Sequence, residues 1–286
     1  MDLQRKVCGN SLEFLGEQKL FILNSSMNDF LNSFSKIKNI DFRDSEGLEE
    51  LKNFHIDSKY FDEMKTMVNF AGSIAGGAAA GTAGGALLAF GAYGAAQALA
   101  AASTGTAIAS LGGAAATNAT LAFFGGGSLA AGGLGMAGGT VVLGGLVVGP
   151  ALLVMGFVAG AAAKKNLEEA YINRDEAIQI YEQLSVASLQ CESIRRRAYM
   201  YYNLLARLDS YFLPLIYKME DILKNEGEDY HMYSPESKKV IASCASFAVT
   251  IKMLLDTPIL TEEGYLTEES SEAVEKVVGK LEETKR

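Results

Sequence analysis

The sequence predicts an all-α protein, an elongated bundle of long helices with a central apolar insert of helical hairpins. Two observations lead to this fold class. Residues 66–163 form a run of 98 residues that contains no Asp, Glu, Lys or Arg. The charged segments on both sides of the run carry apolar residues at alternating spacings of three and four, which is typical of helices that pack lengthwise.

This contrast in composition divides the chain into four segments. Polar helical arms precede and follow the apolar run, and a short polar segment closes the chain. We expect an N-terminal helical arm at 1–65, a Gly/Ala-rich insert at 66–163, a long helical arm at 164–257, and a small hairpin with a C-terminal helix at 258–286.

The N-terminal arm contains an apolar stripe that predicts a helix from about Ser11 to Lys38. Residues 39–43 should break this helix, and Ser45 can cap a second one that runs into the insert without a turn signal. The stripe of the first helix consists of Leu20, Leu23, Met27, Phe30, Phe34 and Ile37.

The uncharged run is too long for a single helix. As one helix it would measure roughly 150 Å, whereas one bilayer crossing takes about 20 residues, so the run can supply about four crossings. Poor helix formers at 103–106, 125–128 and 149–150 are candidate turns. Two apolar hairpins are expected, and one long hairpin is the alternative.

Glycines recur four residues apart within the run, which places them on one helix face where two backbones can approach closely. We expect these glycine faces to pack helices together and to drive oligomerisation. The candidate residues are Gly72, Gly76, Gly77, Gly81, Gly85, Gly135, Gly139, Gly145, Gly149, Gly156 and Gly160.

The arm after the run has the longest regular stripe. It predicts a helix from about Lys164 to Lys224, which Pro214 should kink or end near Phe212. The stripe consists of Leu184, Ala187, Cys191, Ile194, Ala198, Tyr201, Leu205, Leu208, Phe212, Leu215, Met219 and Ile222.

The rest of the chain predicts two further helices. Ser234 followed by Pro235 is a helix start, and this helix should end before Pro258. Residues 259–266 alternate around a glycine and could form a small hairpin. A last helix, residues 268–285, presents Val274, Val277, Val278 and Leu281 on one side.

Charge and cysteine usage limit the function classes. A formal net charge of −9 argues against general nucleic-acid binding. Cys8, Cys191 and Cys244 are scattered and form no disulfide framework or metal motif, so buried free thiols in a reducing compartment are expected.

No residue pattern in the sequence indicates catalysis. His55 and His231 have no partners at metal-ligand spacing. Residues 133–138 spell GxGxxG, but no acidic residue follows them before Lys164, so a dinucleotide site is rejected. We therefore predict no catalytic residue, no cofactor, no metal ligand and no enzymatic activity.

Basic residues bear on membrane orientation. Lys59 and Lys65 precede the run, and Lys164 and Lys165 follow it, so the positive-inside rule places both arms in the cytoplasm.

The basic cluster at 195–197 is interpreted as a solvated helix face, with nucleic-acid or lipid-headgroup contact as the alternative.

The segments Ala116-Thr117-Asn118-Ala119-Thr120-Leu121 and 125–133 resemble those of a widespread group of bacterial glycine-zipper proteins. The overall layout is more distantly similar to the apolipoprotein L type and to alpha-helical pore-forming toxins. These resemblances imply membrane insertion, ion conductance, and a location in the bacterial cytoplasm and inner membrane. They bring no catalytic residues.

Two hypotheses about function follow. The first is a protein that inserts its apolar hairpins into a lipid bilayer, forms homo-oligomers through glycine faces and makes a pore or channel as a toxin or defence effector. The alternative is a soluble helical scaffold or sensor that keeps the insert buried and binds a protein partner through its heptad helices.

Overall fold

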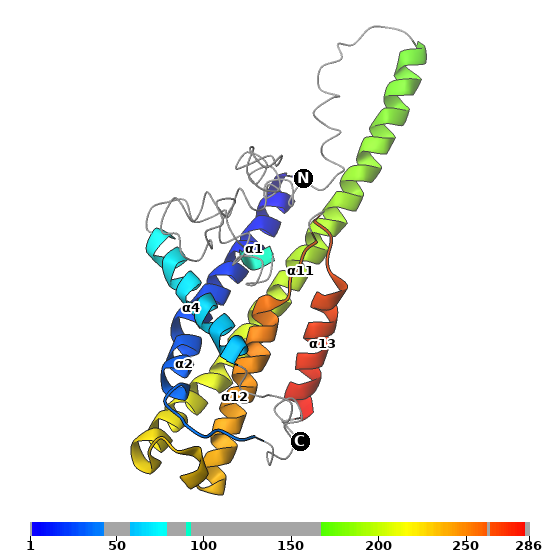
Figure 1. The fold of residues 1–286 in the computed structure, drawn as a ribbon. Helices are drawn as coiled ribbons and strands as arrows, with labels where there is room; N and C mark the ends of the chain where they lie inside the picture. Colours follow the sequence, from blue (N-terminus) through cyan, green and yellow to red (C-terminus); the bar gives the residue numbers. More distant parts are fainter. Residues whose placement is uncertain (1, 43–57, 79–89, 93–166, 262–263, 284–286) are drawn as a thin grey trace.

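The computed structural model describes residues 2–42, 58–78, 90–92, 167–261 and 264–283, and within them the chain is helical without strands (Figure 1). The predicted all-α class and helical bundle are confirmed. Six helices pack together: α1 (Asp2–Ile22), α2 (Asn28–Phe34), α4 (Ser58–Ala78), α11 (Leu167–Glu226), α12 (Pro235–Asp256) and α13 (Glu268–Glu283).

The N-terminal helices and α11 lie side by side and run in the same direction (Figure 1). Three side-chain hydrogen bonds fix this register. The hydroxyl of Ser188 donates to Gln4, that of Ser26 donates to Asp209, and that of Ser33 donates to Glu220. The paired residues are 184, 183 and 187 positions apart, so the two helices stay in step along their common length.

The N-terminal helix starts earlier than predicted, at Asp2 instead of Ser11. Ser11 lies inside the helix, where its hydroxyl donates to the Cys8 carbonyl at 2.7 Å. A five-residue π-helix, η1 (Leu23–Met27), joins α1 to α2. The predicted break near Asn39 is confirmed, since Asn39 adopts a φ of 57°. The start predicted at Ser45 lies outside the described residues.

Aromatic rings form the centre of the core. Phe30 and Phe34 of α2 are 4.9 Å apart between ring centroids. Phe34 stacks on Phe61 of α4 at 5.1 Å, and Phe30 contacts Phe212 of α11 at 5.5 Å. All four side chains are buried, so one cluster holds three helices together and gains the stabilisation of large apolar surfaces removed from water.

The helix after the apolar run does not end near Phe212, and that part of the prediction is wrong. α11 continues through Pro214 to Glu226. Pro214 is exposed, and so is Ser210, whose carbonyl loses its helical partner to the proline. Because both residues stand on the exposed side of the helix, water can reach the backbone there, and the helix continues.

The C-terminal segment follows the predicted helix boundaries. The Ser234 hydroxyl accepts a hydrogen bond from the Ser237 amide, and α12 ends at Asp256, before Pro258. Between α12 and α13 the pairing is one antiparallel bridge, Leu260 with Leu266, without a strand. The apolar side of α13 is buried through Val274, Val277 and Leu281.

Candidate functional site

The first contact between the apolar run and the bundle lies in α4, whose residues 66–78 belong to the run. Phe61, Met64, Met67 and Ala71 are buried and follow one another at spacings of three or four. This spacing places them on one face of the helix. The bundle therefore covers one face of the start of the run.

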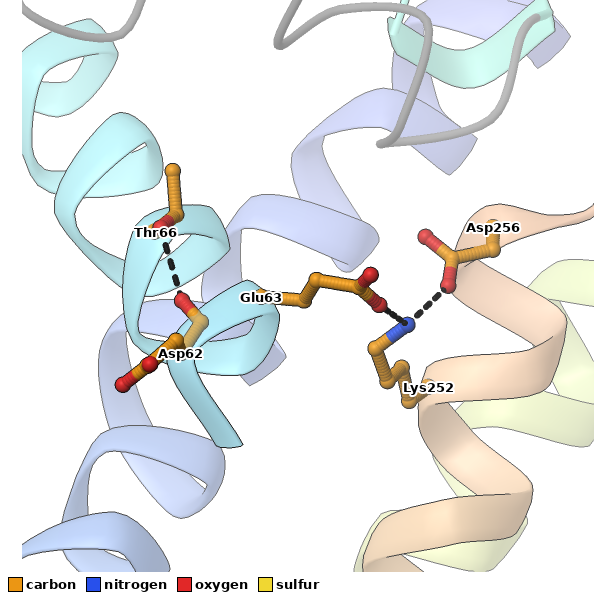
Figure 2. Close-up of polar contacts among 5 residues, drawn as sticks. All are labelled: Asp62, Glu63, Thr66, Lys252 and Asp256. Carbon is orange, nitrogen blue, oxygen red and sulfur yellow. Dashed lines mark hydrogen bonds and ion pairs between the residues drawn. The ribbon is translucent and has the colours of Figure 1, made fainter. Parts of the chain in front are cut away.

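An ion cluster fastens the same part of α4 to α12 (Figure 2). The Lys252 ammonium lies 3.1 Å from Glu63 Oε2 and 2.6 Å from Asp256 Oδ2. The Lys252 side chain is 8% exposed, whereas that of Glu63 is 47% exposed. A buried cation is thus neutralised by two carboxylates, one of which comes from the helix that leads into the run.

Asp256 has one satisfied and one unsatisfied oxygen. Its Oδ2 accepts from Lys252, while its Oδ1 is buried and has no hydrogen-bond partner among the described residues. Its negative charge also acts on Lys19 of α1 and favours the charged form of that lysine. The Asp256 carboxylate therefore links the ion cluster to the second contact of the run.

Lys19 is completely buried at this second contact. Its ammonium nitrogen lies 3.3 Å from the Phe90 carbonyl oxygen and 5.8 Å from the centre of the Phe90 ring. Burial lowers the pKa of Lys19 to about 7, and the attraction of Asp256 opposes this only in part. A lysine that titrates near neutrality thus contacts the apolar run directly.

The residues beside Phe90 are held from two sides. A Cβ atom added to Gly91 would lie 1.9 Å from the Leu12 carbonyl oxygen of α1, so only glycine fits there. The Ala92 carbonyl accepts hydrogen bonds from the amides of Ile259 at 2.8 Å and Leu260 at 3.1 Å. Residues 90–92 are therefore docked between α1 and the segment that follows α12.

The predicted glycine residues are only partly within the described chain. Gly72 lies in α4, and a Cβ atom there would meet Asn24 Oδ1 of η1 at 3.8 Å, an ordinary contact distance. Gly76 and Gly77 also lie in α4. The others lie outside the described residues: Gly81, Gly85, Gly135, Gly139, Gly145, Gly149, Gly156 and Gly160.

The sequence reasoning missed Gly91, Lys19 and Lys252. A search for glycines four apart passes over Gly91, because residues 87 and 95 are Leu and Ala. The two lysines did leave a signal. Lys19 is four residues before Leu23, and Lys252 is eight residues after Cys244, so both occupy positions on the buried side of their helices.

The basic cluster at 195–197 divides between two roles. Arg196 is exposed and pairs with Glu192 on its own helix. Arg197 donates hydrogen bonds to the hydroxyls of Ser270 at 3.0 Å and Ser271 at 2.8 Å, which hold α13 against α11. The interpretation as a solvated face therefore fits Arg196 and fails for Arg197.

The remaining polar candidates have local roles. All three cysteines are buried and free, as predicted. His231 lies in the short 3-10 helix η4 (Tyr230–Met232), where its backbone amide donates to Asp229. His55 lies outside the described residues. Among the described residues, no three His, Cys, Asp or Glu side chains form a group that could hold a metal ion.

An open hollow of about 560 Å³ lies between α1 and α11. Its aromatic lining is exposed on both helices, with Phe14 and Phe21 from α1 and Tyr199 and Tyr202 from α11. Glu17 is the charged residue of the lining. Exposed rings next to a polar edge are a surface that suits an interface between water and an apolar phase.

Among the helices that the structure describes, none is both long and apolar enough to cross a bilayer. Comparisons with protein-family models, curated proteins and solved structures found no match to this chain.

Proposed function

We propose that this chain is a membrane-inserting helical protein that forms homo-oligomers through glycine faces and makes a pore or channel, as a toxin or defence effector does. The observation that carries the proposal is the run at 66–163, which contains no charged residue and is long enough for about four crossings. Glycines four apart within it suit close helix packing in lipid.

The contacts of the bundle with the run support a water-soluble state that precedes insertion. α4 packs one face on the bundle, and residues 90–92 dock between α1 and the segment after α12. Both contacts include a buried lysine, which is an expensive group to keep out of water. Because burying each lysine costs free energy, releasing the run from the bundle recovers that cost.

The same contacts favour one alternative, a soluble scaffold or sensor in which the bundle keeps the run buried permanently. In that case the ion cluster at Lys252 and the tight fit at Gly91 are structural, and a protein partner binds elsewhere on the helices. The two functions differ in whether the protein binds lipid at all.

We place the protein in the bacterial cytoplasm and inner membrane, with both arms on the cytoplasmic side. The lysines on both flanks of the run support this orientation. The likeness of residues 116–121 and 125–133 to bacterial glycine-zipper proteins supports the same assignment. Exposed Phe14 and Phe21 on α1 offer apolar surface for the first encounter with the bilayer.

Flotation and dye release from liposomes test this function with the purified full-length protein. Flotation together with dye release supports a permeabilising protein. Flotation without release supports insertion but contradicts the pore. Absence of both, over a range of pH and with anionic as well as neutral lipids, favours the soluble scaffold.

A matched pair of variants tests whether the run is the inserting part. Val147→Arg places a charge in the run, where a bilayer centre penalises arginine by about 3 kcal/mol. Val278→Arg places the same charge on an exposed position of α13. We expect the first variant to lose flotation and the second to keep it. Equal flotation of both would contradict insertion through the run.

A further inference from the structure

Two cysteine thiols meet at the interface between α1 and α11. Cys8 and Cys191 are both buried, and the two side chains are close enough for a hydrogen bond between them to raise the pKa of the Cys8 thiol. Their separation of 183 positions equals that of Ser26 and Asp209 and is close to that of Gln4 and Ser188, the pairs that set the parallel register. The contact therefore follows from the register of the two helices.

We propose that Cys8 and Cys191 form a reversible disulfide that locks α1 to α11. The two thiols lose two protons and two electrons as the S–S bond forms. The acceptor is a peroxide, which is reduced to water, or a small-molecule disulfide, which is reduced to two thiols. In a reducing compartment such a bond is transient and reports oxidation.

The position of the pair gives the bond a consequence for the apolar run. All of 66–163 lies between residues 8 and 191 in the sequence, so the disulfide would join the two helical arms across the whole run. A cross-link between distant residues restricts the opened chain far more than the closed bundle. This step rests on the function proposed above. We infer that oxidation holds the protein in its closed state, in which the bundle contacts the run.

The surroundings of the pair set how fast it reacts. The hydrogen bond to Cys191 and then burial raise the pKa of the Cys8 thiol, and the nearby charge of Arg195 opposes this. Because the thiolate is the reacting form, the closed bundle protects the pair from rapid oxidation. Oxidation should therefore be slow and should accelerate with rising pH.

Mass spectrometry of the full-length protein tests the disulfide. Reduced protein is treated with oxidised glutathione or hydrogen peroxide, and free thiols are then alkylated. We expect a mass loss of two hydrogen atoms and one cross-linked peptide pair containing Cys8 and Cys191. Separate alkylation of the two residues, stable glutathione adducts on them, or a cross-link to Cys244 would overturn the assignment.

The third cysteine provides the matched control. Cys244 is buried in α12, where burial raises the pKa of its thiol. Cys244→Ser should keep the cross-link, whereas Cys191→Ser should abolish it. Circular dichroism checks that each variant is folded, and Cys8→Ala replaces Cys191→Ser if that variant does not fold.

Two further measurements separate the lock from the proposed membrane function. Oxidation should raise the midpoint of urea unfolding, and reduction should reverse the change. An unchanged midpoint in cross-linked protein would overturn the lock. With liposomes, reduced protein should release dye and oxidised protein should not. If even the reduced protein fails to float, the proposed membrane function is wrong. The mass of the oxidised protein and its urea-unfolding midpoint still test the disulfide between Cys8 and Cys191.

Discussion

The ammonium of Lys252 lies 3.1 Å from the Glu63 carboxylate, and this ion pair joins two helices whose paired residues are 189 positions apart. Glu63 stands three residues before the uncharged run begins. The pair therefore fixes the point at which the apolar run leaves the charged arm, and it does so with a cation that is almost completely buried.

Lys252→Met should destabilise the bundle by about 3 kcal/mol, because the carboxylate of Asp256 loses its partner in a largely buried place. Urea unfolding followed by circular dichroism measures the change. Glu63→Gln should cost only about 1 kcal/mol, since Glu63 is half exposed and solvent screens its charge. The control is Lys224→Met, which removes the exposed pair with Asp221 and should change stability little.

Replacing Lys252, Glu63 and Asp256 together by Met, Gln and Asn should recover most of the stability lost in Lys252→Met. The combined variant leaves no uncompensated charge among these three residues, and the loss of the Asp256 charge near Lys19 keeps the recovery from being complete. If the triple variant is as unstable as Lys252→Met, the loss comes from packing and not from the unpaired carboxylates.

Lys19 should make stability depend on pH between about 7 and 10.5. Its pKa is about 7 in the fold and 10.5 when exposed, so the unfolded chain binds more protons in this window. Stability should rise as pH rises through the window and stay at its lower level below pH 7. Lys19→Met should remove this rise and stabilise the protein at neutral pH by on the order of 2 kcal/mol, because the lost bond to Phe90 offsets part of the gain.

Unfolding midpoints of wild type and Lys19→Met, measured at several pH values, test this expectation. Lys6→Met is the control, because that lysine is exposed on the same helix. A rise with pH that persists unchanged in Lys19→Met would assign the dependence to another group.

Gly91→Ala should undock residues 90–92, because the added Cβ atom would lie 1.9 Å from the Leu12 carbonyl oxygen of a packed helix. Such overpacking costs about 1–3 kcal/mol. Limited proteolysis with a protease that cuts after Phe90 should become faster. The control is Gly279→Ala on α13, where no atom lies within 4 Å, and its cleavage rate should equal that of the wild type.

Gly77→Leu combined with Gly81→Leu should abolish oligomer assembly in lipid, because the two leucines would separate the helix faces that glycines allow to approach. Oligomer size in detergent or nanodiscs measures the effect. Gly279→Leu, at a position of α13 where no atom lies within 4 Å, is the matched control and should leave assembly intact. An unchanged oligomer size in the double variant would show that the glycine face is not the oligomer interface.

Much of the fold could be predicted because the spacing of apolar residues and the caps of helices depend on residues close together in the chain. The stripe from Phe30 to Ile37, the cap at Ser234 and the stop before Pro258 each depend on residues within one or two helical turns. The expectation that the helix could end near Phe212 was wrong, because whether a proline ends a helix depends on which side of the helix meets water.

The candidate site could be predicted only in part. The uncharged run and its glycine pattern are visible in the sequence, and they are the basis of the proposed membrane function. Lys19 and Lys252 stand on the buried side of their helices, and Asp256 follows Lys252 by one helical turn, but nothing local shows that Phe90 and Glu63 converge on the two lysines.

The sequence by itself determined the helical class, several helix boundaries and the division into charged arms and an uncharged run, since these depend on composition and short-range spacing. Only the tertiary structure decided that α1 and α11 run parallel in register. That register brings Cys8 to Cys191, and the packing of the other helices brings α4 to Lys252 and Gly91 to Leu12. The physical reason is that such contacts join residues far apart in the chain, and their partners are set by how whole helices pack.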